Sequence, residues 1–361
     1  MKKILALVMA LALVLCSTSA FALMSEITYC VPRTIESLED SPFHIAKMLL
    51  AEQGITMNIQ ETFGTTDTKM VATNQAQFCG PGPFYVMSAV AEGLPIKAVC
   101  AYDAINIWGM AVTSDSPIQS FEDMIGAQEK YGKKLTVALG DPSWEMLVTP
   151  TLYAAGIDVP NDLEFVVAGE NRYVQVAEKK LDMLFTWPGE CWQLIGQNYD
   201  FNYIDGHEVL KTSSNPLVTS LHMIENEPET VRAFVEAMQQ AIYAVRYNPE
   251  AAAAIIADVF PNIEVTWKAA KFIQEGRVYQ MFGAPGSETE AEILACPGKH
   301  SDEGWKLNMQ AALESGTITE ELDLADVYTN EFINENLDYS KVEAFMDAVE
   351  IAPVAARYAA E

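Results

Sequence analysis

Short apolar runs alternate regularly with helical stretches, in two separate blocks of the chain. In the first block, strands are predicted at 27–30, 55–60, 76–79 and 96–102, and a helix begins at Ser41-Pro42 and ends at Gly54. The pattern is repeated between residues 134 and 186. Regular alternation of strand and helix is typical of mostly parallel sheets with helices on both faces. We therefore predict an α/β fold built from two such units.

The chain is long enough for two domains and a sizeable core, with 361 residues of which 50% are hydrophobic. Two β-rich segments, 108–113 and 218–224, flank the second block, and we interpret them as the crossings between the units. After Pro228 the pattern becomes helical, over 229–247, 249–259, 265–282, 301–315 and 339–349. We predict one lobe from 23–108 plus 219–361, with extra C-terminal helices, and a second lobe from 109–218.

The first 22 residues have the three parts of a secretory signal peptide. Lys2 and Lys3 precede an apolar run, and small residues follow, ending in Ala20-Phe21-Ala22. We predict cleavage after Ala22 and a periplasmic protein; an uncleaved anchor is the alternative. Lipid attachment at Cys16 is less favoured, because the preceding Leu15 is bulky where a small residue is needed.

Acidic residues outnumber basic ones by 50 to 22, which gives a formal net charge of −28. A nucleic-acid-binding protein needs a basic surface to contact phosphates, and so does a protein that docks on anionic lipid. The charge therefore excludes both classes of partner.

The cysteines beyond the leader are Cys30, Cys79, Cys100, Cys191 and Cys296. This odd, scattered set is not a disulfide framework. A Cys30–Cys79 bridge stays open if their strands are neighbours. The chain has no Cys-x-x-Cys pair and no histidine cluster, so we expect neither a zinc site nor a cofactor.

Several ordered segments carry a resemblance to a known family. These are Thr73-Asn74-Gln75-Ala76-Gln77-Phe78, Glu92-Gly93-Leu94-Pro95-Ile96-Lys97, Trp108-Gly109-Met110-Ala111-Val112 and Ser114-Asp115-Ser116-Pro117-Ile118, followed by Phe121-Glu122-Asp123-Met124-Ile125-Gly126. In order and spacing they resemble the substrate-binding proteins of ABC importers, in the group that binds nitrate, sulfonates, taurine and thiamine pyrimidines. Two positions depart from the family pattern, Gln77 and the run Gly126-Ala127-Gln128-Glu129.

The resemblance implies a two-lobed type II periplasmic-binding fold that closes on a small molecule without altering it. It also implies a monomer that delivers the ligand to a membrane permease with its ATPase. No Gly-x-Ser-x-Gly, phosphate loop or His-Glu-x-x-His is present, so no catalytic residues are expected. Two alternatives remain: an enzyme on the same fold, of the thiamine-pyrimidine synthase or menaquinone-pathway type, and a ligand-loaded adaptor for a sensor.

Ligands of open α/β sheets bind beyond the carboxyl ends of the strands, and the loops predicted there supply the site residues. We expect contacts from the helix starts and the side-chain-poor turn, at Thr65, Thr66, Asp141, Ser143, Gly80, Pro81 and Gly82. We expect aromatic walls and charged groups from Phe43, Tyr102, Trp108, Trp144, Trp187, Arg33, Asp103 and Glu190. The same reasoning extends to Glu36, Asp67, Tyr85, Arg172 and Trp192.

Each of these residues has a simpler alternative role. Thr65, Thr66 and Asp141 could only cap helices, the glycines could only form a turn, and most aromatic side chains belong to a core. The arginines favour an anion, whereas the acids favour an amine or a heterocycle. The sequence leaves the sign of the ligand's charge open.

Overall fold

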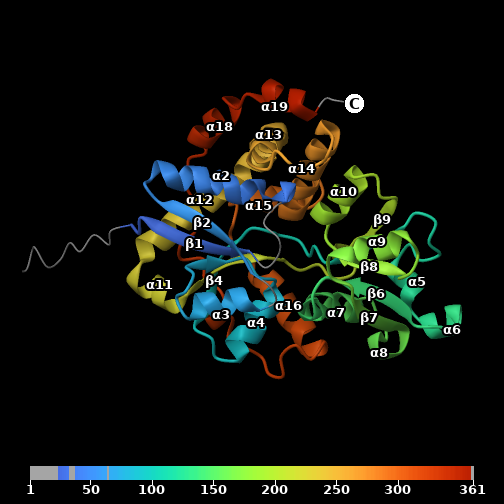
Figure 1. The fold of residues 1–361 in the computed structure, drawn as a ribbon. Coiled ribbons are helices and arrows are strands. Elements are labelled where there is room, and N and C mark those ends of the chain that lie inside the picture. Colours follow the sequence, from blue (N-terminus) through green and yellow to red (C-terminus); the bar gives the residue numbers. More distant parts are fainter. Residues whose placement is uncertain (1–22, 32–36, 63–64, 359–361) are drawn as a thin grey trace, which may run out of the picture.

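A computed structural model describes residues 23–31, 37–62 and 65–358. The predicted signal peptide, Cys16, Arg33 and Glu36 lie outside these residues. Within them, no helix is both long enough and apolar enough to cross a membrane. Two five-stranded sheets lie side by side, each covered by helices (Figure 1). This arrangement confirms the predicted α/β class.

The first sheet has the strand order β2(Thr56–Glu61), β1(Glu26–Val31), β3(Phe78–Cys79), β10(Pro216–Ser220), β4(Ile96–Ala101). The second has the order β7(Leu163–Val167), β6(Leu135–Leu139), β8(Met183–Thr186), β5(Gly109–Thr113), β9(Phe201–Ile204). In each sheet one strand runs against the others, β10 in the first and β5 in the second. The sheets are therefore mostly parallel, as the alternation predicts.

Both reversed strands follow a crossing between the sheets. The carboxyl end of β4 faces the second sheet. The chain therefore enters the second sheet from the side on which the carboxyl ends of the parallel strands of that sheet lie. A strand that starts there must run antiparallel, which accounts for β5, and β10 reverses for the same reason on the return. Our interpretation of 108–113 and 218–224 as the crossings was wrong, because the loops before β5 and before β10 make the crossings. Residues 221–224 belong to helix α11, Leu221–Asn226, which Ser220 caps.

Helices cover both faces of the first sheet. On one face, α2 (Ser41–Glu52) and α12 (Pro228–Tyr247) pack against Ile27 and Tyr29. On the other, α3 (Thr66–Ala72), α4 (Pro83–Ala91) and α16 (Asp302–Glu314) pack against Cys30 and Cys79. Successive residues of a strand point to opposite faces, so Tyr29 and Cys30 enter different parts of the core.

The second sheet has the same layering. α7 (Glu145–Ala154) packs against Val137 and Leu139, whereas α9 (Arg172–Ala177) and α10 (Pro188–Gly196) pack on the face of Ala138 and Leu184. Short helices complete the connections: α5 (Phe121–Met124), α6 (Ala127–Tyr131) and α8 (Val159–Asp162), with the 3-10 turns η1 (Leu38–Asp40), η2 (Pro142–Trp144), η3 (Gly169–Asn171) and η4 (Gly206–Glu208).

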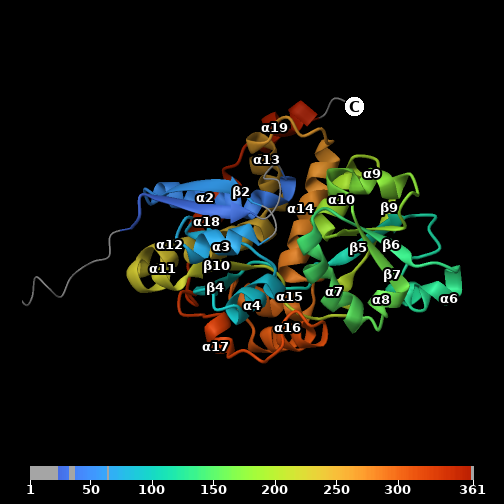
Figure 2. The ribbon, with the colours of Figure 1, turned by 60° about the horizontal axis from the view of Figure 1, so that its bottom comes forward.

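The C-terminal part adds further helices to the first sheet. The predicted ones are α13 (Pro249–Val259), α14 (Trp267–Phe282) and α18 (Ser340–Asp347), whereas α15 (Glu288–Ala295), α17 (Leu324–Val327) and α19 (Ile351–Tyr358) were not predicted. Figure 2 shows α14 between the two sheets, where it packs on α13 and on α10. α14 therefore connects the core of the first sheet to a helix of the second.

Cys30 and Cys79 are direct partners on β1 and β3, so the strand neighbourhood that a bridge requires is present. Both side chains nevertheless remain free thiols, as do Cys100, Cys191 and Cys296. The described part of the chain is therefore held together by its core and hydrogen bonds, without a disulfide.

The contact between α10 and α14 depends on a glycine. A Cβ atom at Gly276 would overlap the indole ring of Trp192, which also packs against Phe272 and Tyr279. We expect Gly276→Ala to lower the free energy of unfolding by about 2 kcal/mol, because overpacking outweighs the gain in helix propensity. Denaturant unfolding measures this, with the exposed neighbour Glu275→Ala as the matched control. Equal stability of both variants and the parent would show that α14 can shift away from the ring.

Candidate functional site

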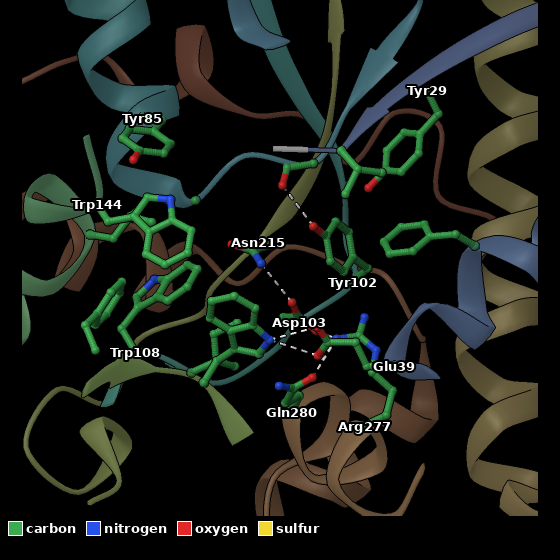
Figure 3. Close-up of a pocket in the computed structure, with 18 residues that line it drawn as sticks. Tyr29, Glu39, Tyr85, Tyr102, Asp103, Trp108, Trp144, Asn215, Arg277 and Gln280 are labelled. Atoms are coloured by element: carbon green, nitrogen blue, oxygen red, sulfur yellow. Dashed lines mark hydrogen bonds and ion pairs between the residues drawn. The ribbon is translucent and has the colours of Figure 1, made fainter. Parts of the chain in front are cut away.

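A cavity of about 690 Å³, its open mouth included, lies between the two sheets. We call it the aromatic cavity (Figure 3). Its lining residues are Tyr29, Val31, Glu39, Phe43, Gly80, Gly82, Tyr85, Tyr102, Asp103, Ile107, Trp108, Trp144, Leu147, Phe185, Trp187, Asn215, Arg277 and Gln280. Its volume lies in the range that small-molecule sites occupy, about 300–1,000 Å³.

The fold places this cavity where strand ends converge. Tyr29 and Val31 close β1, Gly80 follows β3, and Tyr102 follows β4. From the second sheet, Trp187 follows β8 and Trp144 follows β6. The crossings supply Trp108 and Asn215, and α14 supplies Arg277 and Gln280. This is the position beyond the carboxyl ends of the strands at which α/β sheets bind ligands.

Aromatic rings form most of the wall. On the first-sheet side, Phe43 stacks on Tyr29 with a centroid distance of 4.8 Å and meets Tyr102 edge-on at 5.1 Å. On the other side, Trp187 lies at 6.3 Å from Trp108 and at 5.8 Å from Trp144, edge-on to both. Rings fixed by each other in this way present flat apolar surfaces that need little ordering when a flat ligand binds.

A buried ion pair lies at the floor of the cavity. Arg277 Nη1 is 2.8 Å from Asp103 Oδ1, and the two side chains are 5% and 1% exposed. Asn215 Nδ2 donates to the other Asp103 oxygen at 3.1 Å. Burial raises the pKa of Asp103 to about 6, against the opposing effect of Arg277, so the carboxylate is ionised at neutral pH. The pair cancels its own charge.

A second carboxylate lies beside it. The Trp187 indole Nε1 donates to both carboxylate oxygens of Glu39, at 2.8 and 3.0 Å. Gly189, two residues further on, allows this approach, since a Cβ atom there would collide with the Glu39 carboxylate. The hydrogen bond fixes the Trp187 ring at the boundary between the two sheets.

Four buried donor atoms around the cavity have no hydrogen-bond partner among the described residues. They are Trp108 Nε1, Arg277 Nε and Nη2, and Gln280 Nε2. Leaving a buried donor unpaired costs about 1–3 kcal/mol, so such groups call for an acceptor. A flat ring that carries carbonyl or ring-nitrogen acceptors would satisfy these donors.

A second cavity of about 970 Å³, its mouth included, adjoins the first. We call it the polar cavity. Its lining residues are Ser37, Glu39, Gly140, Asp141, Trp144, Glu170, Arg172, Tyr173, Trp187, Glu190, Gln193, Leu194 and Gln197. Glu39, Trp144 and Trp187 line both cavities and form the boundary between them.

Arg172 is the cation of the polar cavity and is only 3% exposed. It forms ion pairs with Glu190 and, at 3.7 Å, with Glu170, and its guanidinium lies 4.9 Å from the Trp144 ring centroid. Glu190 also accepts a hydrogen bond from Thr186 Oγ1 at 2.6 Å, and burial raises its pKa. Arg172 therefore has its charge balanced by acids.

The structure brings most of the predicted site residues together. Those that line the aromatic cavity are Phe43, Gly80, Gly82, Tyr102, Asp103, Trp108, Trp144 and Trp187, together with Tyr85. Asp141, Glu190 and Arg172 line the polar cavity. Trp192 lies outside both cavities and packs on α14.

Some predicted residues have local roles, instead of or in addition to a place in a cavity wall. Thr65, Thr66 and Pro81 line neither cavity. Asp141 caps η2 by accepting from the Ser143 backbone N–H at 2.8 Å. Ser143 lines neither cavity, but its hydroxyl accepts from Tyr85 at 3.0 Å and so joins the two sides of the aromatic cavity.

The glycines of the turn after β3 were expected to let a ligand approach the backbone, but side chains of the protein itself approach them instead. A Cβ atom at Gly80 would collide with the hydroxyls of Tyr29 and Tyr102, and Tyr102 donates to the Gly80 carbonyl at 3.0 Å. At Gly82 the space is taken by Leu147 of the second unit. The turn therefore makes room for tyrosine hydroxyls and for contact between the units.

Sequence reasoning missed several lining residues. Tyr29 and Val31 end the first strand and could have been found from the same strand-end rule. Arg277 and Gln280 are one helical turn apart on α14, far downstream of both blocks, and no motif marks them. Glu39 and Asn215 lie in connecting segments whose path the sequence does not reveal.

Asp67 of α3 lies outside both cavities but has an unusual environment. It is fully buried, its Oδ2 has no hydrogen-bond partner among the described residues, and burial raises its pKa from 3.8 to about 7. Because the folded-state pKa is raised, its protonated form stabilises the fold below about pH 4. This stabilisation is lost as the pH rises towards 7.

Asp67→Asn should remove this pH dependence. Between pH 4 and pH 8 the variant is expected to gain stability relative to the parent by roughly 3 kcal/mol. Urea unfolding at both pH values measures this. Asp123→Asn is the control, because backbone N–H donation from Gln119 holds the pKa of Asp123 below its usual range. This variant is expected to lose stability relative to the parent as the pH rises, which is the opposite direction. If the parent and Asp67→Asn changed in stability by the same amount between pH 4 and pH 8, the assignment to Asp67 would be refuted.

Comparison with known proteins gives the family. Residues 46–252 match the family described as NMT1/THI5 like, and this chain belongs to that family. The riboflavin-binding protein RibY of Chloroflexus aurantiacus is 23% identical over 310 residues, which cover 83% of this chain and 84% of RibY.

Solved structures share the fold at low identity. A periplasmic sulfonate-binding protein, SsuA, assigned to a sulfonate ABC transporter of Methylobacillus flagellatus KT, superposes with a TM-score of 0.56 at 13% identity, covering 86% of this chain and 92% of SsuA. The desulfurization enzyme DSZB superposes with a TM-score of 0.55 at 15% identity, covering 85% of this chain and 97% of the enzyme. The fold is thus that of periplasmic substrate-binding proteins, and an enzyme also uses it.

Proposed function

We propose that this protein captures a small, uncharged aromatic heterocycle in the aromatic cavity and delivers it to the permease of an ABC importer. The observation that carries the proposal is the set of buried donors on Trp108, Arg277 and Gln280 that have no partner among the described residues and lie between facing aromatic walls. Such a site offers stacking to a flat ring and hydrogen bonds to its acceptors. In the proposed complex the ring lies between Tyr102 and Trp187, with Phe43, Gly80 and Gly82 along its edge.

The charges favour a neutral ring over an anion. Arg277 is the cationic side chain among the described lining residues, and Asp103 already neutralises it. A sulfonate or nitrate would bring a negative charge into a buried site where the described residues offer no unpaired cation, which is costly. The heterocycle is therefore preferred to the anionic ligands that the family resemblance also allows.

The relatives and the predicted leader support the physiological part of the proposal. RibY is named for riboflavin, which is a flat heterocycle, and SsuA belongs to the periplasmic binding proteins. The predicted signal peptide would place this chain where an importer collects its solutes. Two lobes that close on the ring would then present it to the permease.

An enzymatic role on the same fold is the alternative that DSZB represents. Among the described residues, neither a cysteine nor a histidine lines either cavity. No group of three or more His, Cys, Asp or Glu side chains in that part of the chain is arranged to hold a metal ion. A binding role therefore fits the lining residues better than nucleophilic catalysis does.

Titration calorimetry and thermal unfolding with a matched panel test the proposal. Flavins and aminopyrimidines are expected to bind and to raise the melting temperature, whereas alkanesulfonates, taurine and nitrate are not. Mass spectrometry after prolonged incubation should recover the bound heterocycle unchanged. Binding of a sulfonate but of no heterocycle would overturn the ligand class, and conversion of the ligand to product would overturn the binding role.

A further inference from the structure

We propose that the ligand carries an uncharged, hydroxyl-bearing chain, and that this chain passes the Trp144–Trp187 boundary and occupies the polar cavity. The inference rests on the proposed function, since it assigns the ring of the same molecule to the aromatic cavity. It adds a second subsite and defines the substrate class as a polyol-substituted or sugar-substituted heterocycle.

The two cavities are adjacent at a boundary of two indole rings. Trp144 and Trp187 each line both cavities, and their ring centroids are 5.8 Å apart at 75°. Trp144 is held from the polar side by the Arg172 guanidinium and lies directly over Gly140, where a Cβ atom would be only 2.6 Å from the ring. If a ring stacks against these indoles in the aromatic cavity, a substituent on that ring can extend into the adjoining polar cavity.

The polar cavity disfavours a negatively charged substituent. Among the described residues, Asp141, Glu170 and Glu190 line it against one cation, Arg172, which is already paired with two of these acids. A phosphate or carboxylate would enter a field of like charge in which this part of the chain offers no free cation. An uncharged chain meets no such repulsion.

Hydroxyl groups fit the remaining hydrogen-bonding groups. Arg172 Nε is buried, has no hydrogen-bond partner among the described residues, and requires an acceptor. The carboxylates of Asp141 and Glu170 accept, and the amide of Gln193 both donates and accepts. A hydroxyl can accept from Arg172 and donate to a carboxylate, whereas an ammonium group can only donate.

Three flavins that share one ring system test the inference. Lumiflavin carries a methyl group where riboflavin carries a neutral ribityl chain, and flavin mononucleotide adds a phosphate to that chain. By calorimetry with the full chain, riboflavin is expected to bind at least about tenfold more tightly than lumiflavin, which is about 1.4 kcal/mol. Flavin mononucleotide is expected to bind at least about tenfold more weakly than riboflavin.

Two glutamine variants locate the effect. Gln193→Ala, in the polar cavity, is expected to weaken riboflavin about fivefold and to leave lumiflavin unchanged, at a contact worth about 1 kcal/mol. Gln280→Met, in the aromatic cavity, is expected to weaken both flavins alike. Thermal unfolding of the free variants checks that both are folded.

The outcomes separate the two proposals. Equal affinity for lumiflavin and riboflavin, or a Gln193→Ala variant that weakens both flavins alike or neither, overturns the second subsite and leaves the heterocycle proposal standing. Tighter binding of flavin mononucleotide, or of a flavin with an aminoalkyl chain, overturns the uncharged hydroxyl chain. Failure of all the flavins and aminopyrimidines to bind overturns the proposed function itself.

Discussion

Trp187→Ala is expected to weaken binding of the heterocycle about 100-fold, which is about 2.7 kcal/mol, in the range of buried aromatic anchors. Trp187 is 9% exposed, forms part of both cavities, and is oriented by its hydrogen bonds to Glu39. Removing the indole takes away a stacking surface and frees Trp144 and Trp108, which it holds edge-on. Titration of the purified variant measures the loss.

Two matched variants separate the ring from its polar atom. Trp187→Phe keeps an aromatic face but loses the donor to Glu39, so we expect an intermediate loss of about tenfold. Trp192→Ala removes an indole of helix α10, which begins directly after Trp187. Trp192 lines neither cavity, so affinity is expected to stay unchanged. Unchanged affinity in Trp187→Ala, or an equal loss in Trp192→Ala, would remove Trp187 from the site.

Arg277→Met is expected to lower the free energy of unfolding by about 3–5 kcal/mol, because it leaves the buried Asp103 carboxylate without its counter-charge. Asp103 is 1% exposed, and without Arg277 the hydrogen bond from the Asn215 amide, at 3.1 Å, is the side-chain interaction that remains to its charge among the described residues. Adding Asp103→Asn to the variant removes that charge and should restore much of the stability. Denaturant unfolding of the single and double variants measures both effects.

An exposed arginine provides the comparison. Arg232 is 42% exposed and lies 3.9 Å from Glu229, so Arg232→Met is expected to cost less than about 1 kcal/mol. If Arg277→Met were as mild as Arg232→Met, or if the double variant were no more stable than Arg277→Met, the ion pair would not hold the floor of the cavity.

Much of the fold follows from local pattern. The strand and helix alternation predicts β1 to β4 within a few residues, and in the second block it predicts strands at 134–139, 164–167 and 183–186, where β6 to β8 lie. The helical period predicts α12, α13 and α14 nearly to their ends. β9 was missed, because Phe201–Ile204 follows α10 closely and carries only a short alternation.

The site was predictable only in part. Strand ends are visible in the sequence, and Tyr102, Trp108, Trp144 and Trp187 follow from them. Arg277 and Gln280 come from a helix that meets the strand ends only through tertiary packing, so their part in the site has no local signal. The sign of the ligand's charge stayed open for the same reason, since the pairing of Arg277 with Asp103 joins residues far apart in sequence.

The division into lobes at 109 and 218 remains a prediction. Sheet membership changes close to both positions, since β5 begins at Gly109 in the second sheet and β10 begins at Pro216 in the first. We expect the two units to close on the ligand, which X-ray scattering measures as a smaller radius of gyration with ligand than without.

A crystal structure of the protein with the tightest-binding heterocycle of the panel tests the central claim most directly. We expect an intact flat ring in the aromatic cavity, stacked between the two aromatic walls. Its acceptors should lie within about 3.2 Å of Trp108 Nε1 and Gln280 Nε2. A ligand bound outside this cavity, or a ring in it that makes no hydrogen bond to these donors, would contradict the account.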